Sequence, residues 1–338
     1  MTIISKIILQ IKKKNFFYSL QKFILSELKF KRFPKNKSRA LNGQIRHEQI
    51  KTGDLSAEIF SGRECWLHRE TGLFIIDKNN VIDEEPYSYW LPEPFFSHKN
   101  QGTSKEYSRV ISFLGPFKGN YCHFILHCFI ALPHVRQLLT KRSWVAFDSD
   151  LKKIPFIYNI VQKEYLSKIL WLEKDIFVNE AVKIKPILDS CSVKWCANYA
   201  AEKSLGLATG PSRVFLVRRN ANRRILANES AIISLLKKFK FQVLDCSLMG
   251  FDDQLTMLRD CEILIAVHGA AATNLLFASN IRIFLEIKDP RDDDDIFYKI
   301  STLKDIQYHA KYGLPLDKGH FLIENKDLID LGCFLKNL

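Results

Sequence analysis

The stretch Ile263–Asn274, ILIAVHGAAATN, has the form of a buried parallel strand that ends in a binding site. An apolar run leads directly into His268, Gly269 and small residues, at the place where a strand reaches the carboxyl edge of its sheet and open α/β folds bind ligands. Gly269 lets a ligand approach the backbone, and the first turn of a following helix would offer free N–H groups to an anion such as a phosphate. His268 can donate to that anion or carry a proton. The alternative is a tight turn of any α/β protein, with His268 on the surface.

Strand and helix patterns alternate on both sides of this stretch. Alternation at this spacing indicates a parallel sheet with right-handed crossovers. Asn228 is the expected N-cap of the first of these helices. The expected elements are strands at 213–219, 241–244, 263–267 and 281–287 and helices at 228–238 and 252–261.

Charged side chains stand at or near the expected carboxyl ends of these strands. Arg218 and Arg219 follow the first strand, His268 follows the third, and Glu286 lies near the end of the fourth. Arginine matches phosphate oxygens, and a carboxylate accepts hydrogen bonds from ribose hydroxyls. The set therefore predicts a site for a nucleoside diphosphate.

The order of these motifs resembles glycosyltransferase family 61, the DUF563 domain. The resemblance covers roughly Phe113 to Ile287. The motifs are Asn120-Tyr121-Cys122-His123-Phe124, Arg218-Arg219, Arg224-Ile225-Leu226-Ala227-Asn228-Glu229, Gln254, His268-Gly269-Ala270-Ala271-Ala272-Thr273-Asn274 and Glu286-Ile287.

The resemblance implies a glycosyltransferase that moves a hexose or pentose from a nucleotide-sugar donor, with a UDP-sugar as the expected donor. It implies inversion, no bound metal, no cofactor, and a GT-B-like α/β fold of two Rossmann-like domains with a cleft between them. Arg218 and Arg219 would hold the diphosphate, and Glu286 would contact the ribose. The expected donor-binding set is Arg218, Arg219, Asn228, Glu229, His268, Gly269, Ala270, Thr273, Asn274 and Glu286.

The acceptor is expected to approach Asn120, Tyr121 and two histidines, His123 and His127. The family has glycine where this chain has Cys122, and an acidic residue where it has His127. A helix would place His123 and His127 on one face, and histidine can act as a general base near neutral pH, so both are candidate catalytic residues. Either can instead be a packed core residue. Their spacing also suits a metal, but the sequence offers no obvious third ligand.

Composition adds limits to this interpretation. The chain has 338 residues, 47% of them hydrophobic, which is enough for two domains of ordinary size. Eight cysteines lie scattered without a CxxC pair, which favours reduced thiols and a cytoplasmic protein. Asp292–Asp295 is interpreted as a solvated loop, and no DxD motif stands in a context that would hold a metal-bound donor.

The formal net charge of +13 and the N-terminal sequence suggest an anionic partner. Between Ile3 and Phe33, apolar residues alternate with lysines, which suits a basic amphipathic helix on an anionic membrane surface. The alternative is a helix packed on the body. The expected location is therefore cytoplasmic, peripheral on the inner face of the cytoplasmic membrane. Nucleic acid is not expected, because no RNP, zinc-finger or helix-turn-helix pattern is present.

The expected organisation has four parts. These are an N-terminal basic segment (1–40), an acceptor-side α/β domain (45–200), a nucleotide-sugar-binding domain (205–310) and a C-terminal segment (311–338) that packs back on the body, across the first domain if the resemblance holds. Together they predict an enzyme of bacterial surface-polysaccharide synthesis, such as capsule or lipopolysaccharide, with a glycan or lipid-linked acceptor. Two other functions stay open: a non-catalytic nucleotide-sugar binder, and a basic membrane or polyanion adaptor.

Overall fold

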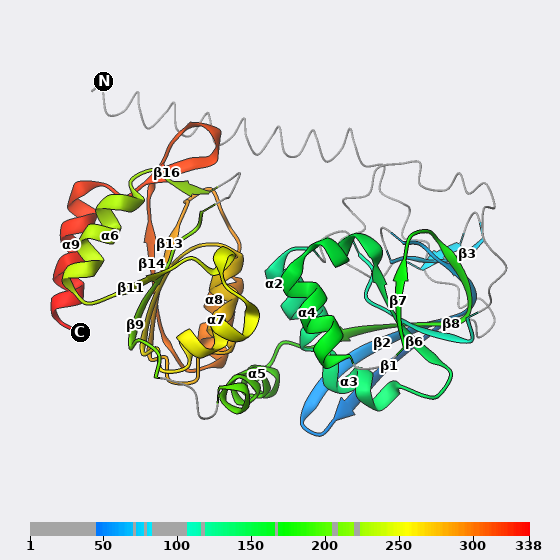
Figure 1. The fold of residues 1–338 in the computed structure, drawn as a ribbon. Coiled ribbons are helices and arrows are strands. Elements are labelled where there is room, and N and C mark those ends of the chain that lie inside the picture. The colour runs from blue at the N-terminus through cyan, green and yellow to red at the C-terminus, as the bar shows by residue number, and fades with distance from the viewer. Residues whose placement is uncertain are drawn as a thin grey trace.

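The described residues form an α/β protein in which helices accompany two large sheets (Figure 1). The structure is a computed structural model, and it describes residues 45–69, 72–77, 80–82, 107–115, 119–165, 168–204, 209–219 and 224–338. The predicted basic segment 1–40 lies outside these ranges. None of the helices in the described ranges has the length and hydropathy that crossing a bilayer requires.

The N-terminal half, residues 45–204, contains a mixed sheet. Its strand order is β4-β3-β2-β8-β5-β6-β7, with β1 paired to β2. Pairing is antiparallel among β1, β2, β3, β4 and β8, whereas β5 pairs in parallel with β6 and β8. Strand β2 pairs with β3 near residues 66–75, where Trp66 lies opposite Ile75 in antiparallel register. The strands are β1 (Ile45–Thr52), β2 (Leu55–Leu67), β3 (Phe74–Asp77), β4 (Asn80–Ile82), β5 (Arg109–Ser112), β6 (Ser143–Asp148), β7 (Ile169–Leu172) and β8 (Ile176–Pro186).

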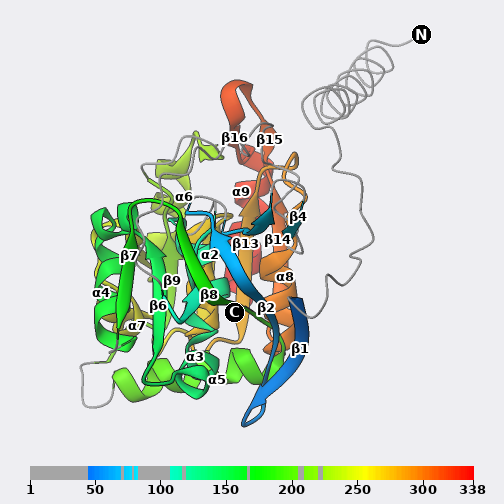
Figure 2. The ribbon, with the colours of Figure 1, turned by 90° about the vertical axis from the view of Figure 1, so that its right-hand side faces the viewer.

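The C-terminal half, residues 209–338, contains a sheet of parallel strands in the order β11-β9-β12-β13-β14. The four strands predicted from the hydrophobic runs are confirmed in kind, with ends that differ by a few residues. The strands are β9 (Arg213–Leu216), β11 (Gln242–Leu244), β12 (Ile263–Val267), β13 (Ile283–Lys288) and β14 (Gln307–Tyr312). A small sheet joins β10 (Ile225–Leu226), β15 (Leu314–Pro315) and β16 (His320–Leu322). Figure 2 shows β15 and β16 at the opposite end of the molecule from the β1–β2 hairpin.

Helices cover both faces of the parallel sheet because its strands alternate their apolar side chains between two cores. Phe215, Ile265 and Leu285 share one core with α6 and α9. Val214, Leu264 and Phe284 face the other core, which includes α7 and α8. A sheet covered on both faces explains why β12 is buried at every position. The helices are α6 (Glu229–Lys238), α7 (Phe251–Leu258), α8 (Ile296–Leu303) and α9 (Asn325–Lys336), with 3-10 turns η4 (Cys246–Leu248), η5 (Ala270–Leu276) and η6 (Asp317–Gly319).

The helical segment from Tyr121 to Leu138 is divided into three pieces. A π-helical turn interrupts it, with the N–H of Ile130 donating to the carbonyl of Ile125 at 3.1 Å. Pro133 then stands in the first turn of the next helix, where its missing N–H costs little. The helices of this half are α2 (Tyr121–Phe124), η2 (Ile125–Phe129), α3 (Leu132–Leu138), η3 (Ser149–Lys153), α4 (Pro155–Glu164) and α5 (Ser190–Lys203).

The two halves share one hydrophobic core and a buried chain of hydrogen bonds. Phe129 packs edge-on against Phe251 and Phe277, with ring centroids 5.6 and 5.5 Å away. The Tyr121 hydroxyl donates to Asn274 Oδ1 at 2.6 Å, and Asn274 Nδ2 donates to Gln254 Oε1 at 2.8 Å. Burial raises the pKa of Tyr121 well above its usual value, so the phenol stays a donor. Three residues of the predicted motifs therefore join the halves.

The C-terminal segment packs on the second half of the chain. Helix α9 lies beside α6 at the far side from the mixed sheet (Figure 1), and Leu331 and Leu335 enter the core that contains Ile232 and Leu236. The expectation that the chain end crosses back over the first half is therefore wrong. The apolar faces of α6 and α9 complete one layer over the parallel sheet, and this burial holds the segment where it is.

We expect Tyr121→Phe to lower the free energy of unfolding by about 1–3 kcal/mol, because it leaves the buried amide oxygen of Asn274 without its donor. Urea unfolding followed by circular dichroism measures this. Tyr158→Phe is the matched control, because the Tyr158 side chain is 40% exposed and stacks on Trp171. Equal unfolding free energies for the two variants would contradict a stabilising role for the link between the halves.

Candidate functional site

The candidate site lies where the parallel sheet changes its direction of winding. From β9 the chain moves outward to β11 on one side and then returns to place β12 on the other side of β9. Connections from two such neighbouring strands leave toward opposite faces, and open α/β sheets bind ligands at the carboxyl ends of these strands. Arg218 follows β9 and His268 follows β12, so the two predicted residues meet at this point.

The Arg218 side chain lies directly over Gly269. A Cβ atom built on Gly269 would stand 1.6 Å from Arg218 Nη1 and 2.8 Å from its Cζ. No residue with a side chain fits there unless the guanidinium moves. The glycine of the His-Gly-Ala motif thus makes room for a cation from the neighbouring strand, in addition to the ligand access that the sequence suggests.

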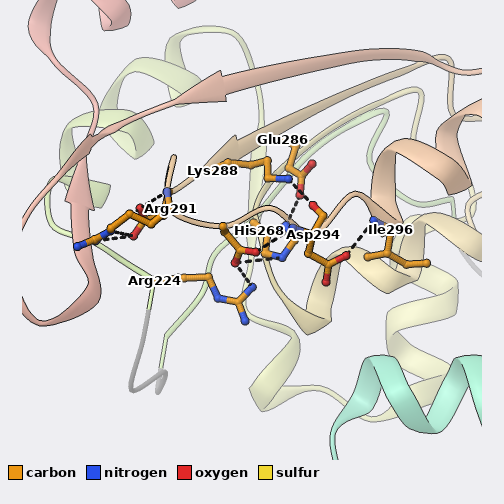
Figure 3. Close-up of polar contacts among 9 residues, drawn as sticks. Arg224, His268, Glu286, Lys288, Arg291, Asp294 and Ile296 are labelled. Atoms are coloured by element: carbon orange, nitrogen blue, oxygen red, sulfur yellow. Dashed lines mark hydrogen bonds and ion pairs between the residues drawn. The ribbon is translucent and has the colours of Figure 1, made fainter. Parts of the chain in front are cut away.

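His268 is fixed by a buried carboxylate. Its side chain is 3% exposed, and Nδ1 pairs with Glu286 Oε1 (Figure 3). The other oxygen of Glu286 accepts a hydrogen bond of 2.6 Å from the Tyr308 hydroxyl. Burial, together with this bond to Glu286, raises the pKa of Tyr308, so the phenol remains a donor. Both oxygens of Glu286, the predicted ribose ligand, are therefore already engaged, one by His268 and the other by Tyr308.

A second carboxylate faces the other ring nitrogen of His268. Asp292 Oδ2 lies 3.6 Å from His268 Nε2 and accepts a hydrogen bond of 2.7 Å from Arg224 Nη1. Burial opposes ionisation of Asp292, but His268, Arg224 and Lys288 outweigh it and hold its pKa below the usual value. The interpretation of 292–295 as a purely solvated loop is therefore wrong for Asp292, whose side chain is only 18% exposed.

The remaining predicted donor-binding residues have mixed surroundings. Arg219 is 54% exposed and lies 3.5 Å from Glu229, atom Nε to Oε1. Asn228 is the N-cap residue of α6, as predicted, but its side chain makes no capping hydrogen bond. Its amide instead exchanges two hydrogen bonds with the backbone of Ile323, at 2.7 and 3.0 Å. Ala270 begins η5, which is a 3-10 helix and not the α-helical turn that the sequence suggests.

The predicted acceptor-side residues gather at the start of α2. Asn120 caps this helix through a bond of 2.9 Å from the N–H of Cys122. The rings of His123 and His127 stack with centroids 5.8 Å apart, as their spacing predicts. Cys122 contacts the buried Thr273 of η5, and burial raises the pKa of its thiol to about 11, so it is neutral and a poor nucleophile at neutral pH.

The described residues contain no group of three or more His, Cys, Asp or Glu side chains that could hold a metal ion. An Asp-Ser-Asp sequence begins at Asp148, the last residue of β6. There Asp148 accepts a hydrogen bond of 2.7 Å from Arg69, and Asp150 pairs with Arg69 and Lys153. Basic side chains thus already neutralise both carboxylates.

Comparison with known proteins shows that part of the chain is similar to a family of glycosyltransferases. Residues 121–283 match the family model described as Glycosyltransferase 61. This part of the chain is therefore similar to glycosyltransferase family 61, in agreement with the resemblance that the motifs carry. Glu286, Asp292 and Tyr308 lie beyond the matched region, whereas Arg218, Arg224 and His268 lie within it.

Similar proteins are EGF domain-specific O-linked N-acetylglucosamine transferases. The chain is 28% identical to the protein of Pan troglodytes over 124 residues, which span 34% of this chain and 23% of the relative. It is 29% identical to the protein of Rattus norvegicus over the same shares, and 30% identical to that of Xenopus laevis over 31% of this chain and 21% of the relative. The aligned segment thus spans less than a quarter of these relatives.

We expect Glu286→Gln to lower the free energy of unfolding by about 3 kcal/mol, because it removes one partner of a buried ion pair. Chemical denaturation at pH 7 is the measurement. Glu262→Gln makes the same change in an exposed pair with Arg282, where the loss should stay below about 1 kcal/mol. Similar losses of unfolding free energy in the two variants would show that the buried Glu286–His268 pair stabilises the fold no more than an exposed pair does.

Proposed function

We propose that the chain is a glycosyltransferase that moves a sugar from a nucleotide-sugar donor to a glycan acceptor. The single observation that carries the proposal is the position of the Arg218 guanidinium over Gly269, beside buried His268, at the carboxyl ends of β9 and β12. A guanidinium and an imidazole at this edge suit a diphosphate. The family of residues 121–283 supports sugar transfer as the reaction.

The donor is assigned to the second half and the acceptor to the first, as two lobes of a GT-B-like arrangement with a cleft between them. The support is that the arginines and His268 belong to the parallel sheet, while His123 and His127 belong to α2 and η2. Contacts from Tyr121 to Asn274 and from Cys122 to Thr273 bring the start of α2 next to η5. A UDP-sugar is the proposed donor, and N-acetylglucosamine, named for the relatives, is a candidate sugar.

The proposed reaction inverts the anomeric centre without a metal ion. A base on the acceptor side removes the proton of the attacking hydroxyl as it bonds to the anomeric carbon, and the bond to the diphosphate breaks. Arg218 and His268 then stabilise the charge that develops on the leaving group, as preorganised donors do in other transferases. We assign the base to the stacked pair His123 and His127.

The biological setting is proposed from the sequence. A basic amphipathic segment over residues 1–40 and an anionic membrane surface would bring the enzyme to a lipid-linked acceptor. This arrangement suits bacterial surface-polysaccharide synthesis by a cytoplasmic, peripheral membrane enzyme.

Nucleotide binding tests the donor site. We expect UDP, rather than GDP or CMP, to raise the melting temperature without added metal, since a ligand at about 100 times its Kd stabilises by about 2.7 kcal/mol. Arg218→Ala should lose the shift. Gly269→Ala should lose it too while keeping every charge, because the new Cβ displaces the guanidinium. Gly332→Ala is the control, since its Cβ meets only Leu235 at 3.6 Å. The proposal fails if none of the three nucleotides binds to the wild type.

Turnover tests the assigned base. We expect His127→Ala to lower kcat by about 100-fold or more, while the Kd for nucleotide stays unchanged, because a general base contributes this much to the rate. Release of nucleoside diphosphate from the donor identified by binding is the measurement. His127→Asp, which restores the acidic residue of the family, should recover activity relative to His127→Ala. A wild type that binds nucleotide but never turns over would instead favour the non-catalytic binder.

A further inference from the structure

A carboxylate of the chain itself joins two cationic donors at the candidate site. Arg224 Nη1 donates to Asp292 Oδ2 at 2.7 Å, and His268 Nε2 lies 3.6 Å from the same oxygen. The three residues come from different elements: Arg224 precedes β10, His268 follows β12, and Asp292 lies in the loop between β13 and α8. Two donors that converge on one anionic oxygen form the arrangement that binds a phosphate oxygen.

The ring of His268 and the backbone of Arg224 are held by contacts that do not involve Asp292. Glu286 and Tyr308 fix His268 from behind, and the Phe297 ring packs edge-on against it at 5.2 Å. The N–H of Arg224 donates to the Gly319 carbonyl at 2.7 Å, and the residue has a φ of 59°, which few side-chain-bearing residues adopt. The fold therefore fixes the His268 ring and the point from which the Arg224 side chain starts.

Asp292 is held mainly by its own loop. Its N–H donates to the Asp289 carbonyl at 2.9 Å, and its Oδ1 accepts from the N–H of Asp294 at 3.2 Å. Arg291 fastens the start of the loop by bonds to Asp289 and to the carbonyls of Leu316 and His320. The Asp292 carboxylate can turn away from Arg224 and His268 by rotation of its own side chain, without unfolding the sheet that carries His268.

We propose that Arg224 and His268 form a phosphate subsite of the donor site, and that Asp292 is a built-in competitor which the diphosphate must displace. The inference rests on the proposed function for the identity of the donor. Arg218 lies over Gly269, next in sequence to His268, so it is placed to hold the adjoining phosphate. The apparent affinity for nucleoside diphosphate is then reduced by the fraction of molecules in which Asp292 occupies the subsite.

The test is calorimetric titration of the whole chain with UDP, uridine and inorganic pyrophosphate. Asp292→Asn should bind UDP and pyrophosphate about tenfold more tightly than the wild type, because the competing charge is removed, and should bind uridine unchanged. Asp293→Asn is the matched control, with the same change in net charge one residue away, and should leave all three affinities as they are. Adding Arg224→Ala to Asp292→Asn should abolish the gain.

Any other result of these titrations would overturn either the phosphate subsite or the assignment of a nucleotide-sugar donor. Weaker binding of UDP and uridine by Asp292→Asn would make Asp292 a ribose ligand, and unchanged binding would mean that it does not compete; both outcomes overturn the proposal. Tighter pyrophosphate binding with no binding of UDP by any variant would support the subsite and refute the nucleotide-sugar function. Because Asp292→Asn also loses an ion pair, Asp292→Ser and urea midpoints serve to separate misfolding from a true loss of affinity.

Discussion

The adjacency of β9 and β12 is the constraint on which the site depends. All strands of this sheet run parallel, so their carboxyl ends meet at one edge. The winding direction changes between these two strands, which brings Arg218 and His268 together although fifty positions separate them in the sequence. Gly269 then determines how close the arginine can come. The positions of both residues follow from the strand order more than from any local interaction.

Several motif residues hold the architecture rather than face a ligand. Asn274 uses its amide to join Tyr121 in the first half to Gln254 in the second, and Asn228 ties the segment before α6 to Ile323. A buried amide without hydrogen-bond partners lowers the stability of the fold, whereas one with all its partners favours a single arrangement of the core. The pattern of the family therefore combines a structural set with a set around His268 that is available for chemistry.

The sequence predicts the strands of the parallel sheet because each is a short apolar run between turn residues. It also predicts that His123 and His127 share one face, because residues four apart lie on the same side of a helix. It does not predict the partners of His268. Glu286, Asp292 and Tyr308 reach it from 18 to 40 positions away along the chain, across a loop and from the last strand of the sheet. The polar run at 292–295 gives no periodic signal that would distinguish its buried member from its exposed neighbours.

The same contacts explain how a chain with a net charge of +13 can keep cations close together at one edge of a sheet. Glu286 offsets His268, Asp292 offsets Arg224, and Glu229 lies near Arg219, so the site is balanced internally. An anionic ligand cannot then bind on net charge alone, because it must replace a carboxylate that already fits. The proposed subsite would favour a diphosphate over a single charge, since two phosphates could engage Arg218 together with the pair that Asp292 holds. This pairing of basic side chains with carboxylates thus favours a ligand whose phosphates match the positions of the basic groups over a polyanion that offers charge alone.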